Sequence, residues 1–213
     1  MNNVKKLTAA AARHVTYVGI TVCSFLCLNW INELLFSRLD VTTGANWVFL
    51  PAGVRLLSTL FFGLAGLEGM FLVGVYLNFH HFMFRSDYRS WSGAVAGSLG
   101  PYLASLFAIH WFMLKRDLEG LNLRRLLFTG LLCGFISPIF HQAFMWVLTG
   151  TVDWATLAAM IVGDTTGILI VLVLAKGAIT YNDRYNVAWH LARRWPFARS
   201  SANRSIQTNR LQK

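Results

Sequence analysis

Six apolar stretches, each close in length to the hydrocarbon core of a bilayer, constrain the fold more than any other feature of the sequence. A helix needs about 20 mainly apolar residues to cross that core. The chain is 55% hydrophobic and 13% charged, whereas a soluble domain carries about 25% charged residues. We therefore expect an all-α fold: a polytopic membrane helix bundle of about six transmembrane helices over residues 1–180. The expected spans are about Val15 to Phe36, Trp47 to Phe62, Leu64 to Phe84, Gly93 to Leu114, Leu123 to Leu148 and Trp154 to Ile179.

The second and third stretches are almost contiguous, and the second is short and contains Pro51. A short apolar segment with almost no connection to the next cannot form an ordinary pair of spans. This pattern predicts either a tight helical hairpin or a broken helix.

Basic residues flank the stretches unequally, which predicts the orientation of the bundle. Lysines and arginines are frequent before the first stretch, between the fourth and fifth, and after the last, whereas the opposite side receives Arg38, Arg85 and Arg89. Because loops rich in Lys and Arg stay in the cytoplasm, we expect both termini there, in the inner (plasma) membrane of a bacterial cell. The first stretch is long enough to span and has no clear cleavage site, so we interpret it as a signal anchor.

Residues 181–213 are predicted to form a separate basic tail. Around Trp189, aromatic residues accompany Arg and His, which is typical of a short amphipathic helix on the membrane surface. After Pro196 the sequence is polar, and we expect disorder there. The net charge of +10 suits anionic lipid headgroups, and no nucleic-acid motif is present. The lipid bilayer and its anionic lipids are therefore the expected partners, and nucleic acid is not.

The final stretch, MIVGDTTGILIVLVL, holds an acid, Asp164, in the middle of an apolar run. An Asp at the centre of a membrane helix costs about 2.5–3.5 kcal/mol, so it needs a partner or water. Arg55 is the basic residue deep in another apolar stretch, and we predict that the two side chains pair inside the bundle. The pair is open to two interpretations: a structural lock between the second and sixth helices, or part of a polar ligand pocket or proton-responsive site. An unpaired Asp164 that faces lipid is the remaining alternative.

Other polar residues within the stretches are candidates for the same buried site, because polar side chains in membrane helices normally face the bundle interior. They are Glu33, Glu68, Asn78, His141 and Thr165. The histidines lack a metal-ligand spacing, and Ser137 with His141 lacks a nucleophile motif. We therefore expect neither a metal site nor an enzyme, and the sequence does not identify a cofactor.

Three Gly-x-x-x-Gly pairs begin at Gly93, Gly130 and Gly163. Small residues at this spacing let helix backbones approach each other closely. Each pair therefore predicts a buried helix face.

Two apolar segments carry a further pattern. WVFLPAGVRLLSTLFFGLAGLEGMFLVG, from Trp47 to Gly74, has an aromatic residue, a Pro-x-Gly segment and a Gly-rich following helix, and VGDTTGILIVLVLA, from Val162 to Ala175, has Gly-Asp-x-x-Gly. Both resemble MASE1-type membrane sensory domains. The matching positions are Pro51, Gly53, Gly163, Asp164 and Gly167. The resemblance implies a membrane-embedded sensor, with Pro51, Gly53, Arg55 and Asp164 around its pocket.

MASE1 domains usually have more helices and precede a diguanylate cyclase, phosphodiesterase or histidine kinase domain, for which this sequence has no motif. We therefore expect a stand-alone sensory or ligand-binding module that takes a small-molecule ligand and signals to a separate partner protein. The alternative is a small transporter, or the substrate-binding subunit of one, because broken helices near the bilayer midplane commonly form transport sites.

Overall fold

The computed structural model describes residues 2–42, 45–81, 87–112, 123–178 and 180–181. The chain divides into two compact units, Met1–Leu172 and Val173–Lys213. In the second unit, Val173 to Ala178 are helical. The tail predicted around Trp189 and after Pro196 lies outside the described residues.

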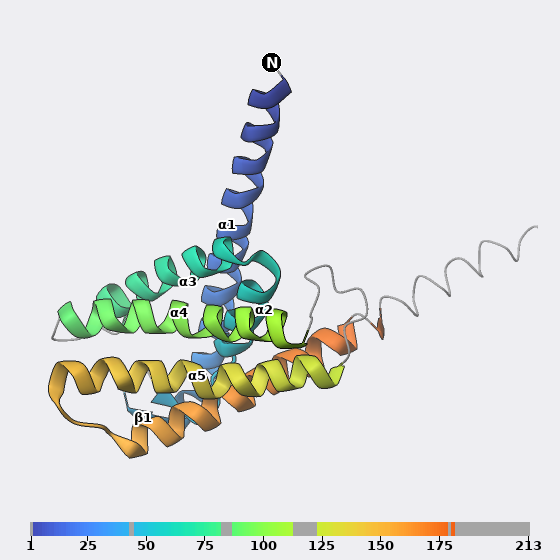
Figure 1. Ribbon diagram of the computed structural model, residues 1–213. Coiled ribbons are helices and arrows are strands. Elements are labelled where there is room, and N and C mark those ends of the chain that lie inside the picture. The colour runs from blue at the N-terminus through green and yellow to red at the C-terminus, as the bar shows by residue number, and fades with distance from the viewer. Residues whose placement is uncertain (1, 43–44, 82–86, 113–122, 179, 182–213) are drawn as a thin grey trace, which may run out of the picture. The chain divides into compact units, whose positions relative to one another are not determined.

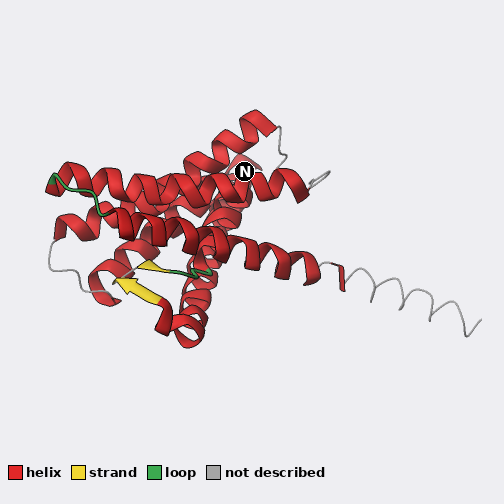
Figure 2. Cartoon of the chain, turned by 90° about the horizontal axis from the view of Figure 1, so that it is seen from below, coloured by secondary structure: helices red, strands yellow, loops and turns green. Residues whose placement is uncertain are grey.

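The described chain is helical apart from one short ribbon and the loops that connect the helices. Its elements are, in order, α1 (Asn2–Phe36), a 3-10 turn (Ser37–Leu39), β1 (Asp40–Thr42), β2 (Ala45–Asn46), α2 (Pro51–Phe62), α3 (Leu64–Tyr76), a π-helical turn (Leu77–His81), α4 (Asp87–Phe112), α5 (Leu123–Thr149) and a final helix, Trp154–Ala178. The two strands, yellow in Figure 2, pair antiparallel. The helical class is confirmed, and the ribbon is an exception that we did not predict. Its sequence, DVTTGAN, favours a hairpin because β-branched residues precede a glycine.

Four of the described helices are long and apolar enough to cross a membrane: Val4–Leu39, Asp87–Trp111, Arg124–Thr149 and Trp154–Ala178. The two helices between the first and second of these are shorter. α2 has 12 residues, which cover about 18 Å at 1.5 Å per residue, whereas the hydrocarbon core is about 30 Å thick. α3 has 13 residues and is extended by the π-helical turn. The chain is thus a membrane protein by helix length and composition, with two short helices inserted between longer ones.

α2 and α3 form the hairpin that was one of the two predicted alternatives. Gly63 separates them and has a φ of 58°, a conformation that glycine adopts without strain. A Cβ atom on Gly66 would collide with the backbone of Ser58, so the start of α3 folds back onto α2. Glycine at both positions therefore permits the sharp reversal.

The longer helices pack side by side. α1 packs against α3 and runs in the same direction, since His14 of α1 contacts Glu68 early in α3, and Glu33 contacts His81 in the π-helical turn that follows α3. Figure 1 shows α3, α4 and α5 alongside one another, and α4 makes the most extensive packing with α5. Alanines of α4 at positions 94, 96, 104 and 108 are fully buried, and their small size lets neighbouring helices approach α4 closely, as Gly74 of α3 does at Ala94.

Candidate functional site

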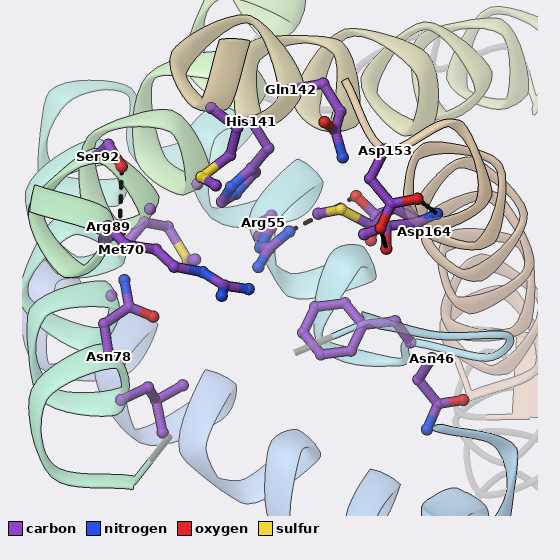
Figure 3. A pocket seen from close by; sticks show the side chains of 18 of the residues that line it. Asn46, Arg55, Met70, Asn78, Arg89, Ser92, His141, Gln142, Asp153 and Asp164 are labelled. Atoms are coloured by element: carbon purple, nitrogen blue, oxygen red, sulfur yellow. Dashed lines mark hydrogen bonds and ion pairs between the residues drawn. The ribbon is translucent and has the colours of Figure 1, made fainter. Parts of the chain in front are cut away.

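A cavity of about 460 Å³ lies within the unit Met1–Leu172. α1, α2, α3, α4, α5 and the final helix all contribute to its lining, as does the segment between β2 and α2 (Figure 3). Pockets for small molecules typically measure about 300–1,000 Å³. The cavity is therefore large enough for a small ligand.

The cavity lies toward one end of the packed helices. It is lined by the first part of α4 up to Gly97, by α5 from His141 onward and by the final helix up to Asp164. Beyond these positions, the same helices carry buried apolar residues of one core cluster, such as Ala108 and Cys133. The cavity is thus closed by apolar packing at that end.

The opposite end of the cavity reaches the surface. Thr149, Thr151 and Asp153, which connect α5 to the final helix, line the cavity and are exposed. Arg89, near the start of α4, lines it from the other side and is also exposed. The cavity is therefore open at the end where α4 begins and α5 ends.

Arg55 of α2 and Asp164 of the final helix form an ion pair in the cavity wall, with 3.5 Å between Nη1 and Oδ2. Their side chains are 13% and 5% exposed. The guanidinium also lies over the rings of Phe49 and Phe25, at 4.8 and 5.7 Å from their centroids, where cation–π attraction adds to the ionic one. The predicted pair is confirmed, and the lipid-facing alternative for Asp164 is wrong.

The segment before α2 places Phe49 and Arg55 beside the final helix. The Phe49 N–H donates to the Gly163 carbonyl at 3.1 Å, and the Leu50 N–H donates to Asn32 Oδ1 at 2.9 Å. A Cβ atom on Gly167 would collide with the Phe49 backbone. The two glycines of the Gly-Asp-x-x-Gly sequence therefore leave room for this irregular segment to pack against the final helix. Asp164, between the two glycines, points toward Arg55.

Four buried polar atoms lack a hydrogen-bond partner among the described residues: Arg55 Nε, Ser137 Oγ, His141 Nε2 and Thr165 Oγ1. Leaving a buried polar group unsatisfied costs about 1–3 kcal/mol. Two of these atoms, on Arg55 and His141, belong to residues that line the cavity. These two atoms lie behind the cavity surface, because each has almost no accessible area of its own.

Glu33 and Glu68 do not line the cavity, so their assignment to the buried site was wrong. Glu33 pairs with His81 at 2.8 Å, and Glu68 pairs with His14 at 2.7 Å. All four side chains are about half exposed. Each acid thus has a histidine partner at the half-exposed contact between α1 and α3, and neither acid pairs with a group in the bundle interior.

The other predicted residues take different places. Asn78 lines the cavity and donates to the Ser90 carbonyl at 2.9 Å. His141 lines it as well, whereas Thr165 lies against Gly134 of α5. Pro51 and Gly53 are buried in the first turn of α2 and do not line the cavity. They instead support the turn that carries Arg55.

The Gly-x-x-x-Gly pairs serve three different contacts, and only one is the predicted approach of two helices. Gly130 and Gly134 of α5 lie against Ile168 and Thr165 of the final helix. Gly163 and Gly167 instead receive the backbone of residues 46–49. The remaining pair, in α4, faces cavity side chains: Gly93 lies near Asn78 and Gly97 near His141.

Sequence reasoning missed several lining residues. Arg89 was assigned to a loop because the apolar run begins at Gly93, but α4 begins at Asp87. Gln142, next to His141, and the aromatic residues Phe25 and Phe49 also line the cavity. Aromatic residues are common throughout the chain, so nothing in their spacing distinguished these two.

Asp153 caps the final helix at the mouth of the cavity. Its Oδ2 accepts from the Thr156 hydroxyl at 2.6 Å, and its Oδ1 accepts from the Thr156 N–H at 3.1 Å. An acid at this position satisfies a helix N–H that would otherwise lack a partner. These hydrogen bonds, led by that of the hydroxyl, lower the pKa of the Asp153 carboxyl below its ordinary value.

Comparison with known proteins finds no matching family model, no matching curated protein and no matching solved structure. The MASE1 resemblance stays a prediction. Within the described ranges, no three His, Cys, Asp or Glu side chains gather in a way that could hold a metal ion.

Proposed function

We propose that this protein is an integral membrane protein that binds a small polar solute in the cavity beside Arg55 and Asp164. The observation that carries the proposal is a buried ion pair, with unpartnered polar atoms nearby, in the wall of a cavity of ligand size. Charges inside membrane segments are costly and commonly mark functional sites. A purely structural lock requires the ion pair alone, without a cavity beside it.

The cavity opens away from the cytoplasm in this proposal. Its mouth lies where α4 begins and α5 ends, and the connections on that side of the bundle hold fewer basic residues, Arg38, Arg85 and Arg89. The connection from α4 to α5 holds Lys115, Arg116, Arg124 and Arg125, which favours the cytoplasm. Six membrane helices, including the short α2–α3 hairpin, then place both termini in the cytoplasm of a bacterial cell.

The protein works as a sensory module that resembles MASE1 domains and signals to a separate partner protein. A cavity that is open at one end and closed by an apolar core at the other supports binding rather than passage. The ligand enters from outside the cell, and the helices that line the cavity respond to it.

A transporter, or the substrate-binding subunit of one, is the second candidate. The α2–α3 hairpin favours it, because α2 is too short to cross the bilayer and ends at Gly63. Interrupted helices beside a buried polar site are common in transporters. The two candidates differ in whether the cavity is ever accessible from the cytoplasm.

Cysteine labelling tests the cavity and its access. The exposed Cys23 and Cys27 are replaced by serine, and Met145, which lines the cavity, is replaced by cysteine. A membrane-impermeant thiol reagent should modify Met145→Cys in intact spheroplasts and leave it unmodified in inverted vesicles. Leu7→Cys, at an exposed position near the start of α1, is the matched control and should react only in inverted vesicles.

Each other outcome has a definite meaning. Labelling of Met145→Cys from both sides favours the transporter. Labelling in inverted vesicles alone would mean that the cavity opens to the cytoplasm, opposite to the proposed orientation. No labelling from either side, with Leu7→Cys reactive, means that the cavity does not admit solutes and contradicts the binding function.

A further inference from the structure

α4 and α5 carry the same short motif, a glycine followed four residues later by a proline inside the helix. In α4 the motif runs from Gly97 to Pro101, and in α5 it runs from Gly134 to Pro138. Both prolines are fully buried. Because proline has no N–H, the carbonyl group of the glycine four residues earlier loses its helical partner in each motif. Sharp bends in helices occur mainly at such positions.

The two motifs lie against each other. Gly100 and Ser137 directly precede the two prolines, and a Cβ atom on Gly100 would be 3.0 Å from the Cα atom of Ser137. This contact is at the closed end of the cavity, whose lining ends at Gly97 on α4 and at His141 on α5. Beyond it, Cys133 of α5 belongs to the apolar core cluster. The paired prolines therefore lie between the cavity and the apolar core.

Two buried polar side chains lie beside the carbonyl groups that the prolines leave without a helical donor. His141 Nε2 is 3.5 Å from the place of a Cβ atom on Gly97. Ser137 comes three residues after Gly134, a spacing at which a serine hydroxyl can donate to the earlier carbonyl. Neither His141 Nε2 nor Ser137 Oγ has a hydrogen-bond partner in the described part of the chain. Unsatisfied buried groups are costly, and a change in the bend of the two helices can join these donors to the freed carbonyl groups.

α2 connects the proline motif of α4 to the wall of the cavity. The hydroxyl of Thr59 lies 2.7 Å from the carbonyl oxygen of Arg55 within α2. The same hydroxyl lies 3.4 Å from the carbonyl oxygen of Pro101 and 2.7 Å from Ser105 Oγ, both in α4. Because Arg55 pairs with Asp164 in the cavity wall, a movement of α4 at Pro101 also moves the arginine. The bend of α4 is therefore coupled to the shape of the cavity.

We propose that Pro101 and Pro138 form a paired hinge, and that the protein has a second conformation in which the parts of α4 and α5 beyond the cavity tilt at this hinge. In that conformation the two unpartnered donors bond to the two freed carbonyl groups, which offsets the cost of opening the apolar core. The hinge goes beyond the proposed binding function, because it supplies a two-state element that connects the cavity to the opposite ends of the helices. It does not depend on which solute the cavity binds.

Cys133 reports on the second conformation. Its side chain is 1% exposed and packs in a core cluster to which α2, α4, α5 and the final helix contribute, so a thiol reagent reaches it only when that core opens. Replacement of Cys23 and Cys27 by serine leaves Cys133 as the sole cysteine of the full-length chain. Reaction with N-ethylmaleimide in detergent, followed by intact-protein mass, gives its rate of modification relative to that of the protein unfolded in dodecyl sulfate. A minor conformation populated at about 0.1–10% predicts a relative rate of about 0.001–0.1.

The double variant Pro101→Ala/Pro138→Ala tests the hinge. Each alanine supplies the missing N–H to the glycine carbonyl, which removes both the bend and the free acceptor. We expect Cys133 to react at least tenfold more slowly, with a Tm that is not lowered. An unchanged or faster rate would overturn the hinge, because a fixed kink has no second conformation to lose. A relative rate below about 0.001 in the parent protein, or rates that simply follow Tm, would also overturn it, since Cys133 would then react only through global unfolding.

Ser137→Ala tests the second conformation without relying on the proline variant to fold. The Ser137 hydroxyl has no partner in the described conformation, so its loss should leave Tm unchanged. The second conformation loses a hydrogen bond, and modification of Cys133 should slow about fivefold. Ser98→Ala is the matched control, because Ser98 is also buried and its hydroxyl donates to the Ala94 carbonyl within α4 at 2.9 Å. Equal rates for the two serine variants would contradict the proposed second conformation.

The outcomes separate this inference from the proposed function, because Met145→Cys reports on the mouth of the cavity and Cys133 on its closed end. If Cys133 follows these predictions while Met145→Cys is not labelled from either side, the hinge stands and the binding function falls. If Met145→Cys is labelled from outside while the proline and serine variants leave the rate at Cys133 unchanged, the cavity admits solutes and the hinge is wrong.

Discussion

Removing one member of the Arg55–Asp164 pair should destabilise the protein far more than an ordinary substitution. The charged atoms lie 3.5 Å apart, for which Coulomb's law gives about 5 kcal/mol at an effective dielectric constant of about 20. Loss of one partner in a buried pair costs about 3–5 kcal/mol, because the other charge stays buried alone. Both side chains are well shielded, at 13% and 5% exposed, so water compensates little.

The two single changes should not cost the same. Asp164→Asn leaves Arg55 over the rings of Phe49 and Phe25, and we expect the free energy of unfolding to fall by about 3 kcal/mol. Arg55→Gln also loses the cation–π contacts, which adds about 1 kcal/mol. The double variant has no isolated charge, so its loss should be smaller than the sum of the single losses by about 2 kcal/mol.

Unfolding in mixed detergent with increasing dodecyl sulfate, followed by circular dichroism, measures these free energies. Single losses that add within about 0.5 kcal/mol would refute the reasoning, because independent residues behave in that way. A larger loss for Asp164→Asn than for Arg55→Gln would contradict the role of the aromatic rings.

Three further predictions concern topology, pH and the glycines. Reporter fusions after Phe84 and after Lys115 should report opposite sides of the membrane, with Lys115 cytoplasmic; the same side for both would refute the six-helix arrangement. Hydrogen bonds lower the pKa of Asp153 in the folded state, so its contribution to stability is present above the ordinary pKa of an Asp, about 3.9, and is lost as the pH falls through the lowered value. Asn at position 153 can still cap the helix but does not titrate, so in Asp153→Asn the fall of Tm below about pH 4 should be smaller. If the fall is unchanged, other groups cause it. Gly167→Ala should strongly lower the yield of folded protein, because its Cβ collides with the segment before α2; Gly177→Ala, with open space, is its control, and equal yields would contradict that contact.

The sequence by itself determined that the chain is helical and membrane-embedded. Long apolar stretches with few charges must satisfy their backbone hydrogen bonds internally in lipid, and helices do this within one segment. Because this requirement is local, the composition and the lengths of the apolar stretches were enough to predict helices in a membrane. The Arg55–Asp164 pair was predictable for a related reason: a buried acid in an apolar segment requires a counter-charge, and Arg55 is the basic residue deep in another stretch.

Tertiary structure decided which residues share the site. Glu33 and Glu68 looked as well placed as Asp164, yet each meets a histidine across the α1–α3 contact. Arg89 looked like a loop residue, yet the longer α4 brings it to the cavity. Helix periodicity determines which residues share a face, but the rotation of each helix and its choice of neighbour depend on packing between segments far apart in the chain. The irregular backbone of residues 46–49, seated on Gly163 and Gly167, sets the position of Phe49 beside Arg55, and no local pattern in the sequence encodes that contact.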